Sequence, residues 1–386
     1  MVVDSLPSPA GAGSGQPNLA RGSAGELVLS WLEPHEQGMS LRFSTLGDHG
    51  WTDPTVVAHG EGWFVNWADF PSVEPISQSL WAAHWLVRQP ERSVRASYAY
   101  DVALAVSNDA GATWGESLSP HTDDTPTEHG FVSLYRAGAG VGALWLDGRN
   151  MTADGAGMTL RSAVIDAEGQ LRVRPTSEGL VDALVCDCCQ TDVAIGSKGP
   201  VAVYRDRSIL GAEEIRDISV TRLLEGSWQP GTPLANDGWK ISGCPVNGPA
   251  IDADGAQVAV AWFTGASDKP RVRLVRSEDG GQHFSDPADI SQIRPMGRVD
   301  VVTMADGGAV VSWLRRSTPQ EAELCVREVT ADGELGPVHV VARTATARPS
   351  GFPQLQRHVT GLIAAWTDVS GERSRIRTAR LDLRPR

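Results

Sequence analysis

A short apolar segment that ends in an aromatic residue recurs seven times along the chain. In the fifth copy it spans Val258–Trp262, and the closing rings of successive copies lie 51 to 60 residues apart. The seven rings are Trp31, Trp85, Trp145, Tyr204, Trp262, Trp313 and Trp366. Small, β-branched and aromatic residues in so short a run are typical of a strand that is buried on both faces. A period of this length indicates a repeat architecture.

Polar turns divide each repeat into about four strands. In the fifth repeat, the pattern predicts strands at Pro249–Ile251, Gln257–Phe263, Arg271–Arg276 and Ala288–Ile290. Glycine- and aspartate-rich turns separate them, and helix signals are nearly absent from the chain. Seven all-β units of this kind predict one β-propeller domain of seven blades over residues 1–386. Its units are predicted to start near residues 16, 73, 130, 190, 248, 299 and 352.

The last repeat lacks a fourth strand. Its apolar segments lie near Pro353–Gln356, Leu362–Trp366 and Arg375–Leu381, with no further segment after them. The segment Val2–Leu6 precedes the first repeat and is predicted to supply the missing strand. Pairing of the two chain ends in one blade would remove open sheet edges, which are liable to pair with other chains.

Two repeats carry the same turn after their third strand, at Ser107–Trp114 and Ser277–Phe284, and Ser44–Trp51 is a degenerate copy. The pattern Ser-x-Asp-x-Gly-x-Thr-Trp resembles the Asp box of the sialidase superfamily, also known as the BNR repeat. This resemblance implies a sialidase-like propeller in which the Asp caps the turn and the Gly adopts a positive φ. Because sialidases have six blades, six is the alternative to the seven that the repeat count predicts.

The resemblance does not extend to the residues of sialidase catalysis. The family uses three arginines on the substrate carboxylate and a tyrosine nucleophile. Where the family has its first arginine, this chain has Gly15–Leu19, which contains none. The tyrosines of this chain end with Tyr204 in the fourth repeat, whereas the nucleophile of the family comes late in the chain. We therefore do not expect the protein to hydrolyse sialic acid.

Four of the five cysteines lie in two segments that lead into the first strands of neighbouring repeats. Cys186, Cys188 and Cys189 precede the fourth repeat, Cys244 precedes the fifth, and His129 opens the third. Such segments of consecutive blades lie on one face of a propeller, so these side chains are expected to converge. Thiolates and imidazole are good ligands for Cu(I) and Zn(II). The first interpretation is therefore a transition-metal site formed by these five residues.

Two other interpretations of the cysteines remain open. Cys244 can instead form a disulfide with one of the other three, which would join the fourth and fifth repeats. The protein would then be a non-catalytic interaction scaffold. Alternatively, one cysteine is a nucleophile that His129 or a neighbouring arginine activates. Cys325 lies inside a strand of the sixth repeat and is expected to be an inert buried thiol, and His84 a core histidine.

The second candidate function is a sialidase-like glycoside hydrolase that acts on an anionic glycan. In it, Glu128 or Asp147 would be the acid/base, and Arg149 and Arg207 would bind the sugar. We expect Arg149, Arg205 and Arg207 to pair with Asp147 and Asp206 instead. The sequence leaves open whether the protein is an enzyme, and whether its ligand is a metal ion, a small molecule or a glycan.

Composition excludes some partners and suggests a location. The net charge is −13 and there is no basic run, which argues against nucleic acid and anionic membranes as partners. No segment approaches the roughly 20 apolar residues of a membrane span. Residues 1–15 lack the features of a signal peptide but, being rich in Ser, Pro, Ala and Gly, resemble the mature start of an exported protein. Together with the resemblance, this predicts a periplasmic or secreted protein.

Overall fold

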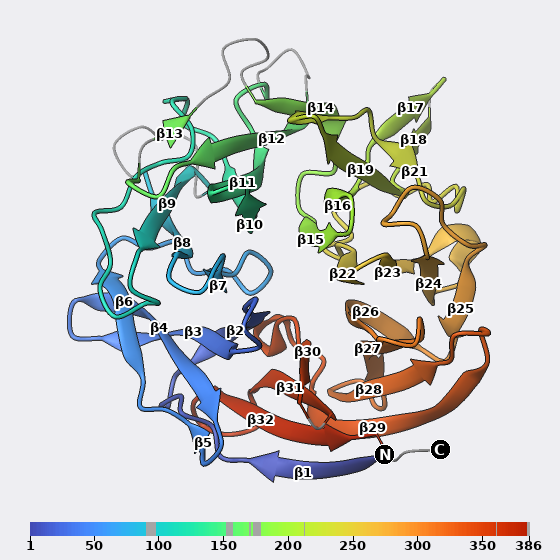
Figure 1. Cartoon of the computed structure of the whole chain (residues 1–386). Helices are drawn as coiled ribbons and strands as arrows, with labels where there is room; N and C mark the ends of the chain where they lie inside the picture. The colour runs from blue at the N-terminus through green and yellow to red at the C-terminus, as the bar shows by residue number, and fades with distance from the viewer. Residues whose placement is uncertain are drawn as a thin grey trace. The chain divides into compact units, whose positions relative to one another are not determined.

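The protein is described by a computed structural model at residues 1–89, 98–151, 157–169, 171–172, 179–211, 213–359 and 361–383. Within these residues the structure is nearly all β, with short 3-10 helices at Ala266–Asp268 (η1) and Arg348–Ser350 (η2). The described strands form seven main sheets and one separate hairpin, the arrangement of a seven-bladed β-propeller (Figure 1). The predicted fold class is confirmed, with seven blades rather than six.

The chain divides into two compact units, one of residues 1–143, 163–174 and 344–386 and the other of residues 144–162 and 175–343. Three sheets lie within the first unit. One has β2 (Gly15–Arg21), β3 (Leu27–His35), β4 (Gly38–Gly47), β5 (Gly50–Trp51) and β6 (Thr55–Gly60). Another has β7 (Ser72–Pro75), β8 (Trp81–Arg88) and β9 (Tyr100–Ser107). The third has β30 (Gln354–His358), β31 (Gly361–Asp368), β32 (Arg375–Asp382) and β1 (Val2–Leu6).

Three further sheets belong to the second unit, apart from the last two residues of the third. The first has β15 (Asp192–Gly196), β16 (Gly199–Arg205), β19 (Ile218–Leu224), β20 (Ser227–Trp228) and β21 (Thr232–Pro233). The second has β22 (Ala250–Asp254), β23 (Gln257–Thr264), β24 (Arg271–Ser277) and β25 (Ala288–Ser291). The third has β26 (Pro295–Thr303), β27 (Ala309–Arg316), β28 (Glu321–Val329) and β29 (Leu335–Ala345). Strands β17 (Ser208–Leu210) and β18 (Glu213–Ile215) form the separate hairpin.

The remaining sheet has residues in both units. Its strands are β10 (His129–Ala137), β11 (Gly140–Asp147), β12 (Met158–Ile165), β13 (Leu171–Arg172) and β14 (Leu180–Val185). No helix among the described residues is long and apolar enough to cross a membrane.

The seven rings of the repeat lie in the second strands of seven different sheets, and all seven are buried. Trp262 of β23 is an example, because its cluster includes Val203 and Val220 from the preceding sheet as well as Val260 and Val275 from its own. The other face of the strand, at Ala259 and Ala261, packs in a second cluster with Val299 and Val311 of the following sheet. The strand that carries the ring is therefore covered on both faces, which explains its continuous apolar sequence. The strands predicted for the fifth repeat are β22–β25, with boundaries shifted by a few residues.

The chain ends pair as predicted. Strand β1 lies antiparallel to β32, with Val2 opposite Asp382 and Leu6 opposite Thr378 (Figure 1). The Thr378 hydroxyl also donates to the carbonyl of Leu6 at 2.8 Å. The outer strand of the last sheet thus comes from the start of the chain, which protects an edge that would otherwise be open.

The turns Ser107–Trp114 and Ser277–Phe284, here called the Ser–Asp turns, are held by hydrogen bonds within themselves. Asp279 accepts from the Ser277 hydroxyl at 2.8 Å and from the backbone N–H groups of Gln282 and His283 at 2.9 and 3.0 Å. These donors lower the pKa of Asp279, with the backbone N–H of His283 contributing most. Gly281 has φ +81°, a conformation that other residues rarely adopt.

Candidate functional site

The cysteine-bearing segments pack directly against each other within the second unit. Residues 186–191 connect β14 to β15, and residues 234–249 connect β21 to β22. The backbone N–H of Gly248 donates to the side-chain oxygen of Gln190 at 2.9 Å. A Cβ atom on residue 248 would lie 2.3 Å from the backbone oxygen of Gln190. The two segments can approach this closely because residue 248 is glycine.

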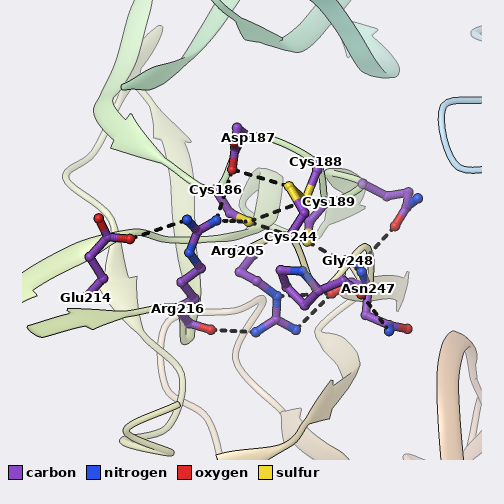
Figure 2. The surroundings of a disulfide bond; sticks show 12 residues. Cys186, Asp187, Cys188, Cys189, Arg205, Glu214, Arg216, Cys244, Asn247 and Gly248 are labelled. Atoms are coloured by element: carbon purple, nitrogen blue, oxygen red, sulfur yellow. Dashed lines mark hydrogen bonds and ion pairs between the residues drawn. A yellow bond between two sulfur atoms is a disulfide. The ribbon is translucent and has the colours of Figure 1, made fainter. Parts of the chain in front are cut away.

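This packing brings four sulfur atoms together (Figure 2). Cys188 and Cys244 are joined by a disulfide bond, with their Cα atoms 5.9 Å apart. Cys186 Sγ lies 3.6 Å from Cys189 Sγ and 4.0 Å from Cys188 Sγ. Cys186 and Cys189 are buried free thiols, whereas Cys244 is exposed. The structure thus unites the four predicted cysteines, and the pairing that was an open alternative for Cys244 is present with Cys188.

Arg216 is the residue of this site that the sequence did not reveal. It lies between β18 and β19, and its Nη1 donates to Cys186 Sγ at 3.1 Å and to Asp187 Oδ1 at 2.9 Å (Figure 2). Its Nη2 donates to Glu214 at 3.3 Å. No local pattern distinguishes Arg216 from the other arginines of the chain. Its role follows only from the hairpin β17–β18, after which the chain returns to the cysteines.

Arg205, at the end of β16, holds the second segment in place. Its guanidinium is buried and donates to the carbonyl oxygens of Asn247, Arg216 and Phe263. Nη2 lies 2.8 Å from the oxygens of Asn247 and Phe263. It also lies 4.8 Å from the centre of the Trp239 ring. The expected pairing of Arg205 with Asp206 is therefore wrong, because backbone carbonyls supply its partners.

The two buried thiols differ in acidity. The hydrogen bond from Cys189 lowers the pKa of Cys186, and the positive charges of Arg205 and Arg216 lower it further against the opposing effect of burial. Burial raises the pKa of Cys189 well above its usual range, and the bond to Cys186 adds to this. Cys186 is therefore the more acidic thiol of the pair. The backbone N–H of Asn247 points at Cys189 Sγ from 3.4 Å.

His129 lies in a different cluster, which belongs to the first unit. Its ring is fully buried, with Nε2 2.9 Å from Asp123 Oδ2 and Nδ1 3.2 Å from Asp101 Oδ1. The ring of His121 stacks on it with the centroids 4.2 Å apart. The ligand atoms of Asp101, His121 and His129 lie within 4.8 Å of one another. The placement of His129 beside the cysteines stays a prediction, because the two clusters belong to different units.

The residues proposed for glycan chemistry have other partners. Asp147 is buried at the end of β11 and accepts from Trp145 Nε1 at 2.9 Å and from both Nε and Nη2 of Arg149 at 2.8 Å. Arg149 thus pairs with Asp147 as expected. Arg207 Nη2 donates to Glu214 at 2.6 Å, so its expected side-chain pairing with Asp206 is wrong. Glu128 directly precedes β10, and its backbone forms an isolated parallel β-bridge with Tyr100 of β9.

Two other predicted residues are part of the core. His84 of β8 is fully buried, which lowers its pKa to about 3, and its Nδ1 lies 3.2 Å from the Ser72 hydroxyl. Cys325 of β28 has no exposed surface, and burial raises its pKa to about 11. Neither residue belongs to the two clusters described above.

No protein-family model matches the chain, and no curated protein matches it. Solved structures match in fold. A PL25 ulvan lyase bound to -[GlcA(1-4)Rha3S]- is similar with a TM-score of 0.60 and 11% identity, over 98% of this chain and 96% of the lyase. A protein of unknown function from Dyadobacter fermentans has a TM-score of 0.50 and 14% identity, over 99% and 98% of the two chains.

A Trypanosoma rangeli sialidase in complex with the inhibitor DANA covers 87% of this chain and 57% of its own length, with 13% identity and a TM-score of 0.46. The fold is thus similar to that of the ulvan lyase. At these identities the likeness describes the fold alone.

Proposed function

We propose that the protein binds a soft transition-metal ion, Cu(I) or Zn(II), through Cys186, Cys188, Cys189 and, in the reduced protein, Cys244. The spacing of the sulfur atoms carries this proposal. Two thiolates on one tetrahedral ion, each about 2.3 Å from it, lie about 3.8 Å apart. The distances from Cys186 Sγ to Cys189 Sγ and Cys188 Sγ are 3.6 and 4.0 Å, on either side of this value. Cys186, Cys188 and Cys189 are therefore already spaced as ligands of one ion, and Cys244 can join them once its bond to Cys188 is reduced.

The surroundings suit a negatively charged metal–thiolate group. Arg216 donates directly to Cys186, and the buried charge of Arg205 lies close enough to favour the thiolate. The N–H of Asn247, aimed at Cys189 Sγ, is the kind of neighbouring donor that orients a metal ligand. Two cationic side chains and one amide thus offset the charge that several thiolates would bring.

The proposed location is periplasmic or secreted, where disulfides persist. There the Cys188–Cys244 bond would be the resting state, and reduction of that bond would complete the set of four thiolates. The proposal therefore makes metal binding depend on the redox state of the site.

The experiment is a titration of anaerobically reduced protein with Cu(I) or Zn(II) against a competing chelator. We expect one tightly bound ion per chain, and at least 100-fold weaker binding by the Cys188→Ser variant. Cys325→Ala is the matched control, because Cys325 is a buried thiol of β28 outside the cluster. Binding weaker than micromolar by the parent, or equal binding by Cys188→Ser, would overturn the proposal.

A glycan-directed enzyme is the second candidate, and the similarity to the ulvan lyase favours it over other enzyme classes. It would use Glu128 or Asp147 as the acid/base, with Arg149 and Arg207 on the anionic sugar. The ion pairs that bind Arg149 to Asp147 and Arg207 to Glu214 would first have to break. Cleavage of an anionic polysaccharide that Asp147→Asn abolishes would support this candidate, and absence of cleavage would exclude it for the substrate tested.

A further inference from the structure

The disulfide of the cluster has one end at the surface and one end against a buried thiol. Cys244 is exposed, and Cys188 is partly buried. On the inner side, Cys186 Sγ lies 4.0 Å from Cys188 Sγ, close to van der Waals contact for two sulfur atoms. Solvent therefore reaches the bond through Cys244, while Cys186 reaches it through Cys188.

Cys186 is placed to attack this bond. Its sulfur receives a hydrogen bond from Arg216 Nη1 at 3.1 Å, and the guanidinium favours the anionic form that acts as the nucleophile. Cys189 is less well placed, because it directly follows Cys188 in the chain. A bond between neighbouring residues is strained, since their Cα atoms are only about 3.8 Å apart. Of the two buried thiols, Cys186 is thus the one that can form a new disulfide bond with Cys188.

We propose that the cluster carries out thiol–disulfide exchange, with Cys186 as the internal nucleophile and Cys244 as the surface sulfur. The thiolate of Cys186 attacks Cys188 Sγ, a Cys186–Cys188 bond forms, and the Cys188–Cys244 bond breaks. Cys244 leaves as a thiolate and takes up the proton that Cys186 gave up, so no electrons are gained or lost. The activity uses the cysteines of the proposed metal site but requires no metal.

The freed Cys244 determines the class of substrate. As an exposed thiolate it attacks a small-molecule or protein disulfide, forms a mixed disulfide with one half and releases the other half as a thiolate. Asp187 Oδ1 lies 3.6 Å from Cys244 Sγ and can accept the hydrogen of the Cys244 thiol once the disulfide has broken. Because this carboxylate also accepts from Arg216 at 2.9 Å, it links the internal nucleophile to the leaving sulfur.

The test uses metal-free oxidised protein in a chelator-containing buffer, with oxidised glutathione as the probe. We expect intact-mass and peptide mass spectrometry to find one glutathione on Cys244 and a Cys186–Cys188 bond within one peptide. The Cys186→Ser variant should keep the Cys188–Cys244 bond and take up no glutathione, and Cys325→Ala should behave as the parent. Melting curves of the oxidised variants show whether each is folded.

A second variant keeps the proposal testable if Cys186→Ser does not fold. Arg216→Gln retains all cysteines but removes the positive charge beside the attacking sulfur, and we expect the reaction at Cys244 to slow about tenfold. A parent that takes up no glutathione, or a rate unchanged by both substitutions, would overturn the exchange proposal. These outcomes are separate from those of the metal titration, which uses fully reduced protein.

Discussion

The Ser–Asp turns and the cysteine cluster are both dense in polar side chains, but the turns combine donors with an acceptor, whereas the cluster repeats one kind of group. In the turn at Ser277–Phe284, the acceptor Asp279 meets donors from Ser277, Gln282 and His283. In the cluster, one kind of group is repeated four times, and the sulfur atoms face one another. In the turn, each donor has an acceptor within the turn, so no ligand is needed. Four thiols offer one another only weak hydrogen bonds, and a disulfide or a bound ion holds them together more strongly, which makes the cluster the candidate for function.

The largest effect is expected where the cluster is fixed to the fold. Replacing Arg205 by Met leaves the carbonyls of Asn247, Arg216 and Phe263 without their buried donor. A buried acceptor left without its donor costs about 1–3 kcal/mol, so the loss of this shared donor should lower the free energy of unfolding by at least that much. Urea unfolding measures the loss, with the exposed Arg136→Met as the control. A change below about 1 kcal/mol would show that Arg205 does not hold the Cys244 segment.

The next prediction compares the two regions directly through their aspartates. Asp279→Ala removes the cap of a Ser–Asp turn and should lower the stability measurably, as the loss of comparable caps does. Asp187→Ala beside the cysteines should cost less than about 1 kcal/mol, because its contacts with Arg216 are partly exposed. It should nonetheless slow the reaction of Cys244 several-fold, because the carboxylate that accepts the hydrogen of the freed Cys244 thiol is lost. If the two substitutions changed the stability and the rate of the Cys244 reaction equally, the two regions would not differ as described.

The pH dependence of stability should also separate buried aspartates from those of the turns. Burial raises the pKa of Asp192, which opens β15, to about 7 from an unfolded value of 3.8. Between these values the folded chain holds a proton that the unfolded chain has lost, so stability falls as pH rises from about 4 to 7 and is level above. This contributes at most about 1.4 kcal/mol per pH unit. The donors on Asp279 lower its pKa, so its contribution is instead lost at acid pH.

Unfolding curves of the parent and of Asp192→Asn between pH 4.5 and 8 measure this difference. The asparagine keeps an acceptor for the N–H of Ile251, which Asp192 binds at 2.8 Å, but has no proton to lose. The decline with rising pH should therefore be shallower in the variant. An identical slope in both proteins would assign the dependence to other groups.

Local patterns in the sequence predicted the fold well because each structural feature depends on residues that are close together in the chain. The ring that closes a buried strand, as at Trp262, and the turn after β24 are both determined by residues close in the chain. The pairing of β1 with β32 was predictable because one blade lacked a strand. The site was predictable in part, since the positions of Cys186 and Cys244 before neighbouring first strands imply proximity.

The partners inside the site depend on tertiary packing and were not predictable. Nothing near Arg216 indicates that the chain turns back to Cys186 after β18. The choice of Cys188 as partner of Cys244 depends on side-chain directions that the spacing of the cysteines does not encode. His121 and Asp101 were likewise missed as neighbours of His129, because stacking and carboxylate contacts involve residues up to 28 positions apart.

Native mass spectrometry of the anaerobically reduced protein after exposure to one equivalent of Cu(I) or Zn(II) tests the central claim most directly. The account predicts a mass increase of one metal ion per chain that is retained after desalting and absent from the Cys188→Ser variant. It also predicts that the oxidised protein, which keeps the Cys188–Cys244 bond, retains less metal. A reduced parent that retains no ion, or a variant that retains as much as the parent, would contradict it.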